Sequence, residues 1–141
     1  MTPEFTITDL ARHVRELGER YDIFIHYHNE CEHARAFSFS NEIETPFIVS
    51  YRTYAIAMHE LGHLLGHGQD RGCLSAERGA WTWARNHALM WTAEMQSEMD
   101  ACQSWYKANR KTEHARWKAD RNAFQQALGA LASAPPAVIE D

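Results

Sequence analysis

The stretch 55–68 constrains this chain more than any other part of its sequence. It reads Ala-Ile-Ala-Met-His-Glu-Leu-Gly-His-Leu-Leu-Gly-His-Gly and contains the pattern His-Glu-x-x-His at His59, Glu60 and His63. On a helix, residues four apart differ by about 40° in rotation and by one turn in height. Both imidazoles can therefore reach one small cation. Glu60 lies beside them, where it can accept a proton from a water molecule that the cation activates.

The helix predicted for this stretch has two unlike faces, and we expect it to begin at Ser50 or Thr53. One face is apolar at helical spacing and carries Ala57, Met58, Leu61, Leu64 and Leu65. The other sets histidines among small residues: Ala55, His59, Gly62, His63 and Gly66. Each glycine costs about 1 kcal/mol relative to alanine inside a helix, so two of them indicate that this face needs room. A metal site fits this pattern, and the alternative is a pair of core histidines hydrogen-bonded to carbonyl groups.

The residues before this stretch predict one helix and a small sheet. Thr8 or Asp9 can cap a helix that runs to about Arg20. Alternating and apolar runs then predict three strands, at 21–28, 34–40 and 47–51. The segment 41–46 between the last two is expected to be a turn, and the strand at 34–40 is expected at an edge. The fold class is therefore α+β, with a small mixed or antiparallel sheet packed on the histidine helix.

Two long helices are expected after the histidine helix. Ser75 can cap the first, whose apolar residues step by threes and fours from Trp81 to Tyr106. Polar residues at 109–111 interrupt this pattern, and a last helix is expected at about 112–132.

A carboxylate lies on the inward face of the first of these helices. Glu77 precedes Ala84 by seven residues, which places it on the apolar face. A carboxylate directed into a core is costly unless it is paired or binds a metal. Glu77 is therefore either part of a buried ion pair or the third ligand of the cation. Two histidines and one glutamate would make a catalytic zinc (Zn2+) site with one position left for water.

Other residues compete with Glu77 for roles at this site. Asp70 could be the third ligand or could orient a ligating histidine. His67, one turn beyond His63, could bind the metal or contact substrate. The residue that stabilises the oxyanion is not identified by the sequence, and Tyr54 and His67 are candidates.

Length and composition exclude several classes of protein. The 141 residues suit one domain, expected at 1–134, with a frayed tail at 135–141. A net charge of −5 argues against nucleic acid as the main partner. The first residues have neither a basic start nor an apolar run, and no stretch reaches transmembrane length, so no membrane association is expected. Three cysteines without a Cys-x-x-Cys pattern fit reduced thiols and a cytoplasmic location.

The order of these features resembles the gluzincin metallopeptidases, and among them the small ImmA/IrrE-like peptidases. The resemblance covers about 21–88, and its firmest part is His59-Glu60-Leu61-Gly62-His63. The stretch 77–84, Glu-Arg-Gly-Ala-Trp-Thr-Trp-Ala, is similar to the second-helix pattern of that family, although Gly79 stands where the family often has another acidic residue. The resemblance implies zinc, a cytoplasmic location, a protein or peptide substrate and a role in prophages, mobile elements or stress responses.

A second class of zinc peptidase shares part of the pattern. The spacing from His59 to Gly66 also matches the opening of the metzincin motif. Gln69, however, stands where the third metzincin histidine belongs, and glutamine is a poor zinc ligand. This class is therefore rejected.

The expected function is that of a zinc-dependent endopeptidase in which Glu60 is the general base. The alternative is a zinc-stabilised protein-binding module without turnover, whose fourth coordination position would be filled by a protein group such as Asp70, Cys73 or His67. The sequence identifies neither the substrate, nor the cleavage site, nor the oligomeric state.

Overall fold

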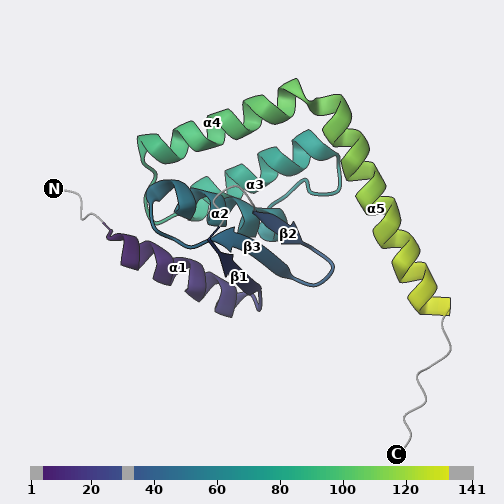
Figure 1. The fold of residues 1–141 in the computed structure, drawn as a ribbon, viewed down its shortest axis with the longest axis horizontal. Coiled ribbons are helices and arrows are strands. Elements are labelled where there is room, and N and C mark those ends of the chain that lie inside the picture. The colour runs from purple at the N-terminus through teal and green to yellow at the C-terminus, as the bar shows by residue number, and fades with distance from the viewer. Residues whose placement is uncertain (1–4, 30–33, 134–141) are drawn as a thin grey trace, which may run out of the picture.

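The computed structural model describes residues 5–29 and 34–133 of the chain (Figure 1). Its elements in chain order are α1 (Ile7–Arg20), β1 (Phe24–His28), β2 (Arg35–Phe37), β3 (Glu42–Pro46), α2 (Tyr51–Leu65), α3 (Cys73–His87), α4 (Ala93–Ala108) and α5 (Arg110–Ser133). Five helices and a three-stranded sheet confirm the α+β class. The predicted tail, 135–141, lies outside the described residues.

The sheet has the strand order β1-β3-β2 and is mixed, as predicted. β1 runs parallel to β3, with Ile25 opposite Ile43, and β2 runs antiparallel to β3. The prediction of a turn at 41–46 and a strand at 47–51 was wrong, because β3, the central strand, occupies 42–46. In β3 the side chains of Ile43 and Thr45 alternate inward and are fully buried, while Glu42 and Glu44 are only partly buried.

The helix starts differ in detail from the expected ones. Thr6, not Thr8 or Asp9, is the N-cap of α1, and Asp9 completes a capping box with it. Ser50 is the N-cap of α2, and Thr53 is its capping-box partner. In each case the sequence pattern identified the right turn of helix, because both members of a capping box are polar.

α2 is the central helix of the fold. It contacts α1, β2, β3, α3 and α4, and its residues 53–62 are all buried. Figure 1 shows α1 and α4 on opposite sides of the molecule, with the sheet, α2 and α3 between them. The core between these layers is built from large apolar side chains, including Leu10, Val14, Ile43, Tyr54, Met58, Leu61, Trp81 and Met95.

The apolar residues from Trp81 to Tyr106 do not form one helix, which corrects the sequence prediction. α3 ends at His87, and α4 begins at Ala93 with Thr92 as its N-cap. α3 also begins before the predicted cap: Gly72 is its N-cap, whereas Ser75 donates a hydrogen bond from within its first turn to the carbonyl of Gly68. The apolar spacing continues across the break because α3 and α4 both pack on α2.

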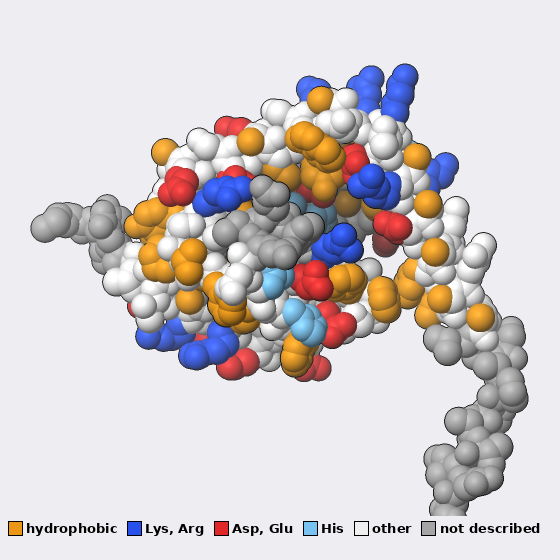
Figure 2. Space-filling view, in the orientation of Figure 1, with side chains coloured by type: hydrophobic (Ala, Val, Ile, Leu, Met, Phe, Trp, Pro, Cys, Tyr) orange, Lys and Arg blue, Asp and Glu red, His pale blue; other side chains and the backbone are white. Residues whose placement is uncertain are grey.

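The last helix, α5, follows α4 after Asn109 and extends away from the rest of the molecule (Figure 1). It is anchored near its start, where Glu113 is buried and α5 contacts α3. Acidic and basic side chains are interspersed over the face seen in Figure 2. None of the helices in the described part of the chain combines the length and the apolar character needed to cross a membrane.

Candidate metal centre

The His-Glu-x-x-His pattern lies in the last two turns of α2, in the interior of the molecule. His59 is 7% exposed and Glu60 is 6% exposed. The rings of His59 and His63 lie close together, with 4.6 Å between their centroids. The helical spacing thus brings the two imidazoles side by side, as the sequence predicts.

Glycines allow α3 to approach this part of α2 very closely. A Cβ atom on Gly62 would overlap the backbone of Ala80, and one on Gly79 would overlap the carbonyl of His67. The room inferred from the glycines of α2 is therefore occupied by the backbone of α3. The contact between Gly79 and the carbonyl of His67 also explains why residue 79 has no side chain. An acidic side chain there would require either α3 or the segment at His67 to move.

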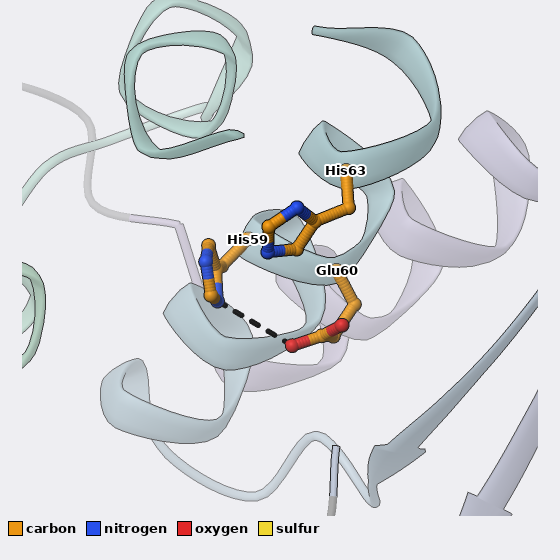
Figure 3. Close-up of side chains that lie close together, drawn as sticks. All are labelled: His59, Glu60 and His63. Carbon is orange, nitrogen blue, oxygen red and sulfur yellow. Dashed lines mark ion pairs between the residues drawn. The ribbon is translucent and has the colours of Figure 1, made fainter. Parts of the chain in front are cut away.

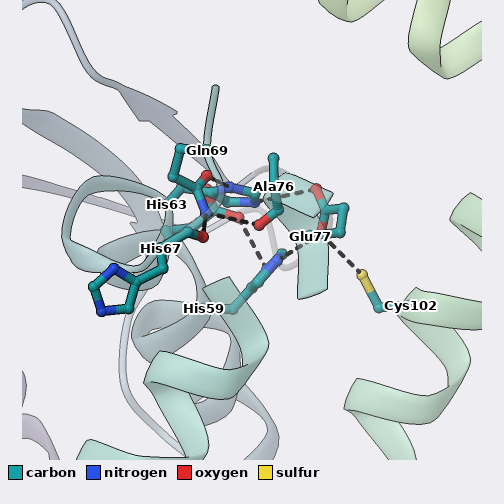
Figure 4. A network of polar contacts seen from close by, with 8 residues as sticks. His59, His63, His67, Gln69, Ala76, Glu77 and Cys102 are labelled. Atoms are coloured by element: carbon teal, nitrogen blue, oxygen red, sulfur yellow. Dashed lines mark hydrogen bonds and ion pairs between the residues drawn. The ribbon is translucent and has the colours of Figure 1, made fainter. Parts of the chain in front are cut away.

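The close approach directs Glu77 of α3 between the two imidazoles of α2 (Figure 4). One carboxylate oxygen, Oε2, lies 2.7 Å from His59 Nε2, and the other, Oε1, lies 3.1 Å from His63 Nε2. Glu77 itself is 6% exposed. The structure therefore brings together all three residues that the sequence analysis assigned to the metal, with the same ring nitrogen of each histidine facing the carboxylate.

Glu60 lies on the other side of the His59 ring (Figure 3). Its Oε1 atom is 3.4 Å from His59 Nδ1, so Glu60 and Glu77 face opposite nitrogens of one imidazole. Ligand atoms of His59, Glu60 and His63 also lie within 4.8 Å of one another. Glu60 is therefore a buried carboxylate beside the histidine pair, as its position in the motif predicts.

Gln69 holds the second histidine, a role that the sequence analysis missed. Gln69 Nε2 donates hydrogen bonds to the carbonyls of Ala76 (2.8 Å) and His67 (3.2 Å), so its Oε1 atom must be an acceptor. That oxygen lies 2.9 Å from His63 Nδ1, which must therefore carry a proton. His63 Nε2 is then the nitrogen available to a metal, an orientation typical of metal-bound histidines.

The three remaining candidates lie outside this cluster. His67 is beyond the end of α2, and its ring points away from Glu77 (Figure 4). Asp70 is 84% exposed and pairs with Arg121 of α5. Tyr54 is fully buried elsewhere: its hydroxyl lies 2.7 Å from His13 Nδ1 and accepts a hydrogen bond from the backbone N–H of Leu89. Their proximity in sequence to the motif was misleading, because His67 and Asp70 are exposed and Tyr54 contacts His13 of α1.

Two further residues enter the site from the surrounding helices. The indole of Trp81 stacks on the His59 ring, with centroids 4.2 Å apart and planes 8° apart. Cys102 of α4 points toward Glu77, with 3.9 Å between Sγ and Oε2. Both residues were assigned to the apolar pattern of one long helix. Only the break at 88–92 reveals that α4 folds back over the site.

The cluster is strongly coupled electrostatically in the absence of a metal ion. Burial lowers the pKa of His59, but its contacts with Glu60 and Glu77 outweigh this effect and raise the pKa to about 9. Burial also lowers the pKa of His63, and the contact with Glu77 again makes the net direction upward. Burial raises the pKa of Glu77, yet hydrogen bonds from the two histidines hold it well below its usual range. At neutral pH the Glu77 carboxylate therefore faces a protonated imidazole on His59.

The donor set fits a zinc ion better than it fits most other metals. Imidazole nitrogens with one carboxylate are typical ligands of catalytic zinc, whereas magnesium and calcium prefer oxygen alone. All four ring nitrogens of the two histidines face side-chain oxygens rather than backbone carbonyls. A bound cation would replace the protons between the histidines and Glu77 and keep the same three side chains together.

Comparisons with protein-family models, curated proteins and solved structures found no match to this chain. The candidate metal centre therefore rests on its own geometry.

Proposed function

We propose that this protein is a zinc-dependent peptidase whose metal is held by His59, His63 and Glu77. One observation carries this proposal: the Glu77 carboxylate of α3 meets both imidazoles of a His-Glu-x-x-His helix, 2.7 Å and 3.1 Å from their Nε2 atoms. A purely structural pair of histidines would not require a second buried carboxylate, Glu60, at the same place.

Each residue of the site has a separate task in hydrolysis. A zinc ion, when bound, would lower the pKa of water and polarise the substrate carbonyl. Glu60 accepts the proton of the attacking water and passes it to the leaving amine. Gln69 keeps the Nδ1 proton on His63, and the stacked Trp81 ring holds the plane of His59. The burial of Glu60 and Glu77 makes their charges more effective, because the local dielectric is low.

The substrate of such a site would be a protein or peptide in an extended conformation. β2 is an edge strand that contacts α2, the helix that carries the histidines, so a substrate backbone could pair with its free edge. The resemblance to ImmA/IrrE-like peptidases supports a cytoplasmic enzyme that cleaves regulatory proteins of a prophage, mobile element or stress response.

A zinc-stabilised binding module without turnover is the second candidate, and Cys102 is the observation that favours it. A sulfur close to Glu77 could complete four protein ligands, which is typical of structural zinc. The retained carboxylate of Glu60 favours the peptidase instead, because a closed structural site has no use for a base.

Metal analysis and a cleavage assay test this proposal together. Purified protein is expected to contain one zinc per chain and, once loaded with zinc, to release fluorescent peptides from labelled casein. The assay should include the Cys102→Ser variant, which removes the nearby sulfur. If the parent protein and Cys102→Ser both bind zinc and neither hydrolyses casein, the binding module is favoured. Failure of the parent protein to bind zinc would overturn both candidates.

A further inference from the structure

We propose that Cys102 Sγ is a fourth ligand of the metal held by His59, His63 and Glu77, so that α4 closes the site at rest. This inference rests on the proposed metal site and adds a regulatory element to it.

The position of the sulfur is the first argument. One ligand atom each from His59, Glu77 and Cys102 lie within 4.8 Å of one another, and the Sγ–Oε2 distance is 3.9 Å. Ordinary zinc bond lengths place a sulfur and an oxygen on one tetrahedral ion roughly 3.6 Å apart. The sulfur is therefore within about 0.3 Å of a ligating distance from Glu77.

The packing of α4 keeps the sulfur in this position. Met95, Met99 and Cys102 recur at helical spacing on the face of α4 that packs against the core, and Met95 is fully buried. α4 contacts both α2 and α3, the two helices that supply the other ligands. The Cys102 thiol is thus part-buried on the face of α4 that packs against these two helices.

The indole of Trp81 supplies an independent indication of a ligand. Trp81 is 1% exposed, and its Nε1 atom has no hydrogen-bond partner in the described part of the chain. The Trp81 ring stacks on the ring of His59, so this unpaired donor belongs to a side chain that lines the proposed metal site. A metal-bound thiolate accepts such a donor better than a neutral thiol does, because hydrogen bonds to charged acceptors are stronger.

Coordination by Cys102 would exclude water from the fourth position. The Sγ–metal bond would form as the thiol proton passes to solvent and a bound water leaves. Hydrolysis would then require the reverse exchange: the sulfur takes up a proton and a water occupies the freed position. A displacement of α4, driven by substrate or by a partner, would therefore activate the site.

Spectroscopy of the metal-loaded protein can test the ligation directly. X-ray absorption on the zinc form should show one sulfur at about 2.3 Å beside nitrogen and oxygen neighbours. The cobalt(II) form should show a sulfur-to-metal charge-transfer band in the near ultraviolet. Cys102→Ser should lose both signals and bind metal at least about tenfold more weakly. Cys73→Ser is the control, because Cys73 is a free cysteine that belongs to neither group of candidate metal-binding residues in the described part of the chain.

The outcomes separate this inference from the function on which it rests. A sulfur signal that disappears in Cys102→Ser and persists in Cys73→Ser would support it. Metal bound by nitrogen and oxygen alone would overturn the inference and leave the proposed metal site intact, as would a sulfur signal that survives in Cys102→Ser. If the parent protein and Cys102→Ser both fail to bind metal, the metal site itself is wrong.

Discussion

Gly62 of α2 lies directly against the backbone of Ala80 in α3, with no space between them for even a methyl group. This contact brings the helix that carries Glu77 against the helix that carries the histidines. The geometry of the candidate metal centre therefore depends on a residue that has no side chain.

Replacement of Gly62 by alanine is expected to push α2 and α3 apart. Overpacking of this kind costs about 1 to 3 kcal/mol in the free energy of unfolding, and metal affinity should fall as Glu77 withdraws from the histidines. Chemical denaturation and a zinc-binding titration measure the two effects. Gly129→Ala is the control: nothing lies within 4 Å of the added Cβ in α5, so this change should be neutral or stabilising. Equal behaviour of the two variants would contradict the packing argument.

Glu60→Gln is expected to keep zinc and lose hydrolysis. The amide has nearly the same shape as the carboxylate but cannot accept the proton of the attacking water, so the rate should fall by roughly 10²- to 10⁴-fold. The zinc content of the variant, measured by mass spectrometry of the native protein, should match that of the parent. A variant that cleaves as fast as the parent would remove Glu60 from its role as base.

Gln69→Ala is expected to weaken zinc binding by about ten- to a hundredfold, because His63 loses the acceptor that fixes its Nδ1 proton. A competition titration with a chromophoric chelator measures this change. Asp70→Ala is the matched control from the same loop, since the Asp70 carboxylate pairs with Arg121 and not with a histidine. Weaker binding in the Asp70 variant than in the Gln69 variant would show that the wrong side chain has been assigned to His63.

The stability of chelator-treated protein is expected to fall as the pH rises from about 6.5 to about 9. The folded-state pKa of His59 is raised from 6.5 to about 9 by Glu60 and Glu77 against the effect of burial. The stabilisation from its charged form is thus fully present below about 6.5 and lost as the pH passes through about 9. The pKa of His63 is raised as well. Thermal melts across this range would show the trend as a falling Tm.

The stabilisation that bound zinc provides should instead increase with pH, because zinc binds the neutral form of the imidazoles. The rise in Tm on zinc addition is therefore expected to grow between about pH 6.5 and 9. Glu77→Gln removes the charge that faces both histidines and should flatten both trends. A parent protein with a level Tm over this range and no response to zinc would contradict the protonation described for the cluster.

The sequence by itself determined the local features of this protein. The spacing of His59, Glu60 and His63 places them together on any helix, and the capping residues locate the starts of α1 and α2 to within about one turn. The inward position of Glu77 followed from its seven-residue distance to Ala84. These inferences depend on helical periodicity, which acts over one or two turns and can be read from neighbouring residues.

Tertiary structure decided everything that depends on contacts between distant segments. Glu42 to Pro46 forms the central strand because two other strands pair with it, although its glutamates and proline resemble a turn. Gln69 rather than Asp70 is the hydrogen-bond partner of His63, because the loop after α2 turns Gln69 toward α3. Cys102 faces Glu77 only because the chain reverses between α3 and α4, and no local pattern encodes where such a reversal directs a side chain.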